Sequence, residues 1–300
     1  MKQLKETGLF LLLFMFNILV GTTLLFTIKI SISNIHLLVF FIITSIIYYF
    51  YRRKTNIKDI IKTILISLAI IIISIILSSF MFDRSSDGNT YHKDAVGVLK
   101  EGFNPIYESS KDIIKKRTDD SKKLTNYSIW TDHYAKANWI IAANFYSLTN
   151  NIESGKAMNI ISLYIVFSLI ATSLVKKLSL KKSLLLALII VLNPITASQL
   201  FTYYNDQLVC LYLFLSISCL IKLDYDINDK EEWLVYILSF TILANMKFNG
   251  LGYLLVFSFL FACKYLYKAI KDKAFILIFK KLCLIFIPLF ILSLLVVGYP

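Results

Sequence analysis

Three short polar segments interrupt an otherwise strongly apolar sequence, and the first carries residue types that often catalyse reactions. It contains Asp83, Asp87, Tyr91 and His92 within the stretch 82–107. Carboxylates and imidazoles can exchange a proton with a reacting hydroxyl group near neutral pH. We therefore expect a catalytic base in this segment, with Asp87 favoured and Asp83 as the reserve.

The other two polar segments lie later in the chain. One is 203–206, with the sequence YYND, and the other holds Lys247 and Asn249. Ionisable groups at or near the depth of a bilayer are costly, and function is the usual reason for their presence. If the three segments face the same side of a membrane, their side chains can converge on one site.

Each of these residues also has an ordinary structural role open to it. Asp87 and Asp206 could each cap the N-terminus of a following helix. His92 could be an exposed imidazole in a loop, and Lys247 could extend to the membrane interface instead of binding an anion. The tyrosines at 203–204 are suited to an aromatic belt at the interface.

The composition is typical of a membrane protein. Of 300 residues, 57% are hydrophobic and 17% are charged, and the mean hydropathy is +0.69, which is too apolar for a soluble domain. The net charge of +13 comes mostly from Lys and Arg in short loops. This pattern indicates membrane orientation and no nucleic-acid partner. The four cysteines lie in apolar stretches without metal-ligand or redox spacing.

Apolar stretches about long enough to cross a hydrocarbon core recur along the chain. They predict an all-α, polytopic fold with about nine transmembrane helices, forming a single domain over 1–300. The stretches are 9–29, 35–51, 60–80, 157–175, 183–201, 207–222, 233–246, 251–267 and 274–297.

Two of these assignments have alternatives. The first stretch follows a basic start, as in a signal peptide, but it is long enough to span a bilayer and lacks a convincing cleavage site, so we expect an uncleaved helix. The stretches 233–246 and 251–267 could instead form one long, broken helix. That arrangement would put the lysine-rich segment 264–273 on the opposite side from the other lysine-rich loops, so a helical hairpin is favoured.

The positive-inside rule predicts the orientation. The segments expected in the cytoplasm are the N-terminus, 51–59, 176–182, 222–232 and 264–273. The segments expected outside the plasma membrane are 31–34, the large first loop 81–156, 201–206, 247–250 and the C-terminus. Within the large loop we expect an amphipathic helix over 94–101 and another, lying in the interface, over 130–148. The three polar segments then share the extracytoplasmic face.

A carboxylate, an imidazole and a basic group on that face suit the transfer of a group from a lipid-linked phosphate. The carboxylate can take the proton from an incoming hydroxyl. A cation, or a divalent metal ion such as Mg or Mn, can offset the charge that develops on the departing phosphate. The lipid tail of such a donor needs a groove among the helices.

Several sets of residues, in this order along the chain, resemble markers of the bacterial GT-C integral-membrane glycosyltransferases. The sets are Asp87-x-x-x-Tyr91-His92 with Gly102-Phe103-Asn104-Pro105; 134–139 with 142–149 and 155–159; Asn193-Pro194, Gln199 and 203–206; and Asn245, Lys247, Phe248 and Gly250. The resemblance covers about residues 60 to 260. It implies a polyprenyl-phosphate-linked sugar donor, an envelope glycan or lipid acceptor, and inversion at the anomeric carbon. Because such enzymes generally continue with more helices, we expect a chain truncated at its C-terminus.

The resemblance also implies roles for individual residues. Asp87 is expected to be the general base, with His92 assisting and Asp83 in reserve. The residues expected to bind substrate are Tyr91, Asn205, Asp206, Lys247 and Asn249, with Lys247 at the donor phosphate. The residues expected to hold a divalent metal ion are Asp87, His92 and Asp206.

Other functions stay open at this stage. A polysaccharide polymerase or ligase also uses an outer loop between many helices, but is expected to rely more on Arg and His than this loop does. A transporter or flippase commonly places ionisable groups at the midplane of broken helices, often in repeated halves, and the sequence contains no internal repeat. A non-catalytic remnant is the third alternative. Under every reading, membrane lipids are partners.

Overall fold

The computed structural model describes residues 1–111, 130–175, 177–271, 279, 282–283 and 287. Over these residues all regular structure is helical, so the predicted all-α class is confirmed for this part of the chain. The predicted span at 274–297 and the middle of the loop 81–156 lie largely outside the described residues.

Short connections join most of the helices. The elements are α1 (Lys2–Thr27), α2 (His36–Tyr51), α3 (Ile57–Phe80), η1 (Gly88–His92), α4 (Lys93–Lys100), α7 (Ala137–Thr149), η2 (Ile152–Lys156), α8 (Ala157–Leu174), α9 (Leu180–Val191), α10 (Pro194–Gln199), α11 (Asp206–Tyr225), α12 (Lys230–Ala244) and α13 (Phe248–Lys271).

Several of these helices have the length and apolar composition of membrane-spanning segments, which indicates a membrane protein. The segments long and apolar enough to cross a bilayer, within the described residues, are Lys2–Thr27, Ile57–Phe80, Ile152–Leu174, Asp206–Tyr225 and Phe248–Tyr267. Helix α2 is apolar but shorter. The number of spans supported in this way is five, so the predicted count of nine is not confirmed.

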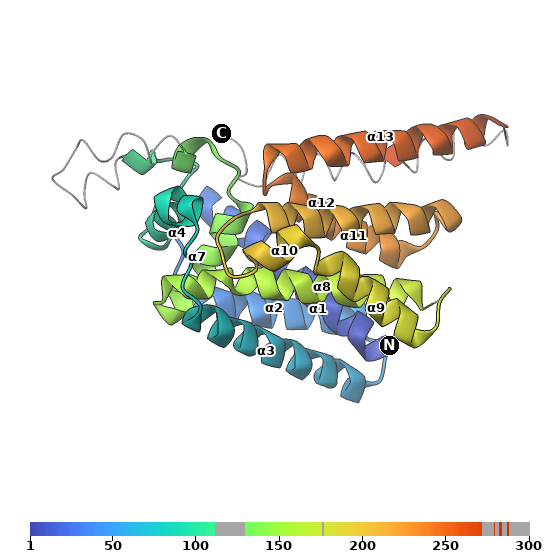
Figure 1. The fold of residues 1–300 in the computed structure, drawn as a ribbon, viewed down its shortest axis with the longest axis horizontal. Helices are drawn as coiled ribbons and strands as arrows, with labels where there is room; N and C mark the ends of the chain where they lie inside the picture. The colour runs from blue at the N-terminus through green and yellow to red at the C-terminus, as the bar shows by residue number, and fades with distance from the viewer. Residues whose placement is uncertain (112–129, 176, 272–278, 280–281, 284–286, 288–300) are drawn as a thin grey trace.

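Helix α1 lies inside the bundle, where it packs against α2, α3, α7, α8 and α12 (Figure 1). Most of its side chains between Thr7 and Phe26 are buried. A helix that is apolar around its whole circumference is suited to such a central position. Helix α3, in contrast, exposes a row of aliphatic side chains that includes Ile61, Leu65 and Ile72, which matches contact with membrane lipid.

Ion pairs gather the N-terminus and two later segments at one end of the bundle. Lys2 pairs with Asp59 at 3.0 Å, and Arg52 reaches Glu6 at 2.8 Å and Glu231 at 2.7 Å. We call residues 1–6, 51–59 and 222–232 the N-terminal end. These segments are the ones that the positive-inside rule places together; their location in the cytoplasm stays a prediction.

The segments predicted to lie on the opposite side meet at the other end, which we call the site end (81–111, 130–156, 200–206 and 245–249). The backbone N–H of Tyr203 donates to Asp83, and that of Ala137 donates to the carbonyl of Asn245. In Figure 1, α4 and α7 gather at this end, away from the N-terminus. The polar segments therefore share one end, as their predicted common face requires.

The predicted span over 183–201 is wrong, because the chain breaks within it. The side chain of Asn193 accepts hydrogen bonds from the N–H groups of Ile195 and Thr196, and Pro194 begins the short α10. Proline at the first position of a helix starts a new helix and cannot continue the preceding one. The remaining helix, α9, has 12 residues and is about 18 Å long, which is too short to cross a bilayer.

The predicted interfacial helix over 130–148 also differs from the structure. Helix α7 begins at Ala137, and every residue from Ala137 to Phe145 is buried. It packs against α1, α2, α4, η2 and α8. Its Trp139 and Phe145 therefore contact protein and not the membrane interface. The helical hairpin, in contrast, is supported: α12 ends at Ala244, α13 begins at Phe248, and the two helices are in contact.

A pair of glycine substitutions tests the packing of α1. At Gly8 an added Cβ would lie 2.0 Å from Ser168 Oγ and 3.3 Å from a Leu169 side-chain atom, whereas nothing lies within 4 Å of one at Gly252. Gly8→Ala should cost about 1–3 kcal/mol by overpacking. Gly252→Ala should stabilise α13 by about 1 kcal/mol through helix propensity. Thermal unfolding in detergent measures both, and a stabilising Gly8→Ala would refute the close α1–α8 approach.

Candidate functional site

Asp83 connects two of the polar segments through its carboxylate. Its side chain is buried, with Oδ1 accepting a hydrogen bond from the N–H of Ser85 at 2.8 Å and Oδ2 accepting one from the N–H of Tyr203 at 2.9 Å. The turn that follows α3 is thereby attached to the segment before α11. Asp83 is the second candidate for the base in the sequence-based prediction. Both of its carboxylate oxygens accept backbone hydrogen bonds.

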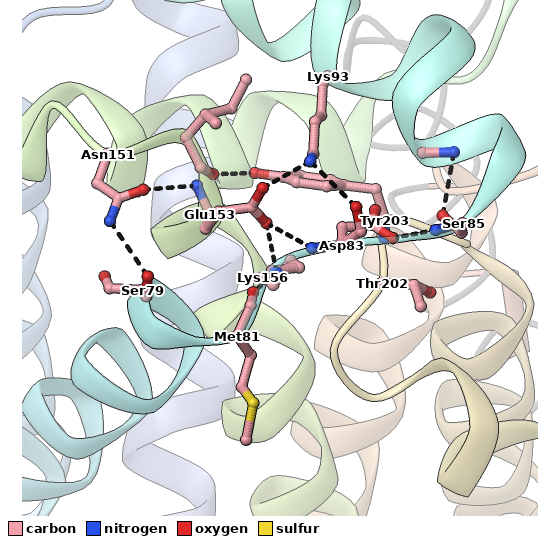
Figure 2. Close-up of polar contacts among 12 residues, drawn as sticks. Ser79, Met81, Asp83, Ser85, Lys93, Asn151, Glu153, Lys156, Thr202 and Tyr203 are labelled. Carbon is pink, nitrogen blue, oxygen red and sulfur yellow. Dashed lines mark hydrogen bonds and ion pairs between the residues drawn. The ribbon is translucent and has the colours of Figure 1, made fainter.

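A buried ion-pair cluster lies beside Asp83 and centres on Glu153 (Figure 2). The carboxylate of Glu153 pairs with Lys93 at 2.5 Å and with Lys156 at 2.5 Å, and also accepts the N–H of Asp83 at 3.1 Å. Lys156 is fully buried and also donates to the carbonyl of Met81. Together with Asp83, these groups carry two negative and two positive charges, so the cluster is balanced.

This cluster was not predicted from the sequence, although a local signal was present. Glu153 and Lys156 lie three residues apart, a spacing that places them on one helical face. They directly precede the apolar helix α8. An acid and a base at that depth are costly unless they are paired. Lys93, the third member, follows His92 and gave no comparable signal.

Asp87 keeps a carboxylate oxygen that accepts no hydrogen bond from the described residues. Asp87 stands at the N-terminus of η1, but its side chain makes no capping hydrogen bond. The helix-capping role considered from the sequence is therefore not observed. Within the described residues its side chain accepts one hydrogen bond, from the hydroxyl of Tyr91 at 3.3 Å. The side chain is half-buried, so a reacting hydroxyl group could reach it.

His92 is buried, with 2% of its surface exposed, so the exposed imidazole considered from the sequence is wrong. The indole Nε1–H of Trp139 donates to Nδ1 of His92 at 2.7 Å. An indole nitrogen can only donate, so the neutral ring carries its proton on Nε2. Burial lowers the pKa of His92 to about 4, although the charge of Asp83 opposes this shift. At neutral pH His92 is therefore an uncharged donor.

Aromatic rings surround the Asp87–Tyr91 pair. The Tyr91 ring lies 5.8 Å from that of Trp130, in a stacked arrangement, and 6.1 Å from that of Tyr134. Tyr134 in turn lies 5.6 Å from Trp139. Trp130 is 51% exposed and so presents an apolar surface to a ligand. Burial, with the neighbouring Tyr134 and Asp87, raises the pKa of the Tyr91 hydroxyl, which stays protonated.

Asp206 and Lys247 form an ion pair at this end, with 2.6 Å between Oδ1 and Nζ. Burial alone would lower the pKa of Lys247, but the hydrogen bond that Lys247 donates to Asp206 and the charges of Asp206 and Asp87 raise it overall. The N-cap of α11 is Asn205 and not Asp206. Lys247 is therefore paired with a carboxylate, and its role at a donor phosphate stays a prediction.

Three buried amides, two of them close to this pair in the sequence, carry polar atoms without hydrogen-bond partners. The side chain of Asn138 donates to Asn205, which leaves Asn138 Oδ1 and Asn205 Nδ2 unsatisfied, and Asn245 Oδ1 is unsatisfied as well. The N–H of Ala137 donates to the carbonyl of Asn245 at 3.0 Å, which brings the segments together. Unsatisfied buried groups are costly, so these atoms are suited to holding water or ligand hydroxyls.

Two pockets open at the site end. The first, which we call the Arg84 pocket, has a volume of about 490 Å³. Its lining residues include Phe82, Arg84, Ser85, Ser198, Thr202 and Tyr204. The second, the Lys247 pocket, has a volume of about 380 Å³, and its lining residues are His133, Tyr134, Ala135, Lys247, Phe248 and Asn249. Tyr134, which lines the second pocket, has its ring 6.1 Å from that of Tyr91, and Ser85, which lines the first pocket, is two residues before Asp87.

The structure thus brings together most of the residues singled out from the sequence. The charges of Asp83, Lys247 and Asp206 all act on the pKa of His92, and the charge of Asp87 acts on that of Lys247. Tyr203 differs from its expected place in an interfacial belt, because its ring is buried and its hydroxyl donates to the carbonyl of Ile152.

The arrangement of the carboxylates bears on the predicted metal ion. Within the described part of the chain, no three Asp, Glu, His or Cys side chains form a group that could hold one. Lys247 already pairs with Asp206, and Trp139 donates to His92. Asp87, His92 and Asp206 as arranged do not fit a shared metal, and a metal-dependent reaction stays a prediction.

The fold and the site define an all-helical membrane protein with a polar, aromatic-walled site at one end of its bundle. Comparison of the chain with models of protein families, with curated proteins and with solved structures found no match. The function must therefore be argued from the chemistry of the site.

The first prediction for the site concerns Glu153. Glu153→Gln leaves the buried ammonium of Lys156, and that of Lys93, without a carboxylate, and removing one partner of a buried pair typically costs about 3–5 kcal/mol. The matched control is Asp59→Asn, whose pair with Lys2 is 49% and 70% exposed and should contribute less than about 1 kcal/mol. Thermal unfolding in detergent compares them, and equal losses for the two variants would contradict the buried cluster.

The second prediction is a pH dependence. The pKa of His92 is about 4 in the folded protein and 6.5 when unperturbed, so the unfolded chain binds a proton first as the pH falls. Stability should therefore decrease from about pH 6.5 towards pH 4, by about 2 kcal/mol at pH 5. His92→Gln should remove this part of the loss in thermal unfolding scans at pH 7 and pH 5.

His133→Gln is the control for this pH series, because the His133 side chain is exposed. It should leave the pH dependence as it is in the parent protein. Identical curves for the parent and His92→Gln would show that His92 is not a buried, neutral ring.

Proposed function

We propose that this chain is a membrane glycosyltransferase, which moves a sugar from a polyprenyl-phosphate donor to an envelope glycan or glycolipid on the outer face of the plasma membrane. One observation carries the proposal. Segments 83–92, 130–139, 203–206 and 245–249 meet at one end of the bundle, where two pockets open and the half-buried Asp87 keeps an oxygen without a hydrogen bond among the described residues. Two substrates and a base need such an arrangement.

Asp87 is the proposed general base. It is half-buried and accepts only a hydrogen bond from Tyr91, among the described residues, so one oxygen is free for an acceptor hydroxyl. In the reaction the hydroxyl oxygen attacks the anomeric carbon, its proton passes to Asp87, and the bond to the donor phosphate breaks. Tyr91 stays protonated and keeps the carboxylate in place.

The donor phosphate is better suited to Arg84 than to Lys247, which the sequence favours. Lys247 is neutralised by Asp206, whereas Arg84 has no hydrogen bond or ion pair with the described residues. Arg84 lines its pocket beside the hydroxyl groups of Ser85 and Thr202. A guanidinium binds phosphate through paired hydrogen bonds and would stabilise the charge of the leaving group.

The remaining polar groups are suited to the sugar and the acceptor. His92 presents a neutral Nε2–H, and the unsatisfied atoms of Asn138 and Asn205 can pair with hydroxyls. The exposed ring of Trp130 offers an apolar face on which the C–H surface of a sugar can pack. Asn249, exposed in the Lys247 pocket, and the Asp206–Lys247 pair provide further donors and acceptors for an acceptor glycan.

The test is sugar transfer by the full chain in proteoliposomes, with a polyprenyl-phosphate sugar as donor. Asp87→Asn should lower kcat by about 10²–10⁴-fold, because the amide cannot take up the proton, and should leave thermal unfolding close to that of the parent. Turnover by Asp87→Asn equal to that of the parent would exclude Asp87 as the base.

Arg84→Gln provides a second readout in the same assay. It should raise the KM for the donor and make transfer less sensitive to salt, because a charged contact to the phosphate is lost. The matched control is Arg53→Gln, which makes the same change at an exposed arginine of the N-terminal end and should have no effect. Equal effects of the two variants would remove Arg84 from the site.

A further inference from the structure

An apolar groove opens at the N-terminal end, away from the candidate site. It has a volume of about 630 Å³ and lies between α1, α2 and α12. Its walls include Leu9, Ile47, Leu234 and Ile237, and its polar residues include Tyr51 and Lys230. The groove therefore combines an aliphatic interior with a cation and a hydroxyl group.

The polar and apolar parts of this groove are separated along its length. Lys230 is the first residue of α12 and Tyr51 the last residue of α2, so both lie at the N-terminal end of the bundle. Ile237 is seven residues further along α12, which places it about 10 Å deeper. A ligand that fits must have an anionic head and an aliphatic tail.

The helices around the groove are held by ion pairs that do not involve Lys230. Glu231 of α12 pairs with Lys5 of α1 and with Arg52, and Arg52 also pairs with Glu6. Tyr48 of α2 donates to Glu6 at 2.7 Å. These contacts fix α12 relative to α1 and α2, so the groove is preformed.

Lys230 and Tyr51 retain free polar groups at the mouth of the groove. Among the described residues, neither the ammonium of Lys230 nor the hydroxyl of Tyr51 has a hydrogen bond or ion pair. Arg52 lies over the Tyr51 ring at 4.7 Å, and its own charge is balanced by Glu6 and Glu231. A phosphate would therefore meet a cation and a hydroxyl donor that have no other partner.

We propose that this groove binds an anionic glycerophospholipid of the bilayer, with an acyl chain along Leu9, Leu234 and Ile237 and the phosphate at Lys230 and Tyr51. A neutral lipid would fill the groove but leave the cation without a counter-charge. A soluble anion would leave the aliphatic walls empty. The site is separate from the proposed transfer reaction and does not rest on it.

Trp233 makes the proposal measurable, because it lines the groove and is one of only three tryptophans in the chain. The protein is placed in phosphatidylcholine bilayers that contain a small fraction of acyl-brominated phosphatidylglycerol, and quenching of its fluorescence is followed. Brominated phosphatidylcholine at the same fraction is the comparison. The Trp233→Phe variant gives the signal of the other two tryptophans, which is subtracted.

Quenching of Trp233 should be stronger with the brominated anionic lipid than with the brominated neutral lipid. Lys230→Gln should reduce this preference about fivefold, the effect of one cation near a membrane surface. Lys58→Gln, at an exposed lysine of the same end that does not line the groove, should keep the preference. Lys230 is exposed, so its substitution should leave thermal unfolding unchanged.

Three results would overturn the proposal. Equal quenching by both lipids in the parent protein would mean that ordinary surrounding lipid occupies the groove. An unchanged preference in Lys230→Gln would place the anionic lipid elsewhere. Absence of quenching at Trp233 by either lipid would mean that acyl chains do not enter the groove.

Discussion

The site end depends on the buried carboxylate of Glu153. It accepts hydrogen bonds from Lys93, Lys156 and the backbone of Asp83, and so connects the turn after α3, the start of α4 and the start of α8. Asp83 extends this connection to Tyr203. The desolvation of these charges is tolerable because each has a partner of opposite sign. Asp87 takes no part in this pairing, so the structural role and the proposed chemical role fall on different acids.

The ion pairs at the two ends of the bundle differ in how far they are buried. At the N-terminal end the ion pairs are partly exposed and bind helices α1, α2, α3 and α12 to one another. At the site end the cluster around Glu153 is largely buried, and His92 is kept neutral by its surroundings. A site with few unpaired charges of its own is suited to a substrate that brings the charge. Arg84, which has no partner among the described residues, is the group placed to receive it.

Much of this organisation could be predicted from the sequence, because hydropathy and the distribution of lysines are local properties. They place the segments of Asp87, Asp206 and Lys247 on one side of a helical bundle, and the structure has them at one end. Tertiary partners could not be predicted in this way. Nothing local to His92 indicates that Trp139 covers it, and the pairing of Lys93 with Glu153 joins residues 60 positions apart. The break in the helix at Asn193 and Pro194 could have been predicted from the sequence, because the Asn-Pro dipeptide is a common turn signal.

The position of Lys247 in the chain has a consequence for biogenesis. The carboxylates of Asp83 and Asp87 leave the ribosome early, but the chain reaches Glu153 only after the outer loop has been made, and Lys247 comes between α12 and α13. If helices enter the membrane in the order of synthesis, the bundle around α1 and α8 can form before the ion pair of Asp206 exists. A partly synthesised chain would then hold the scaffold of the site while lacking one of its walls, and the α12–α13 hairpin would be the last part needed to complete it.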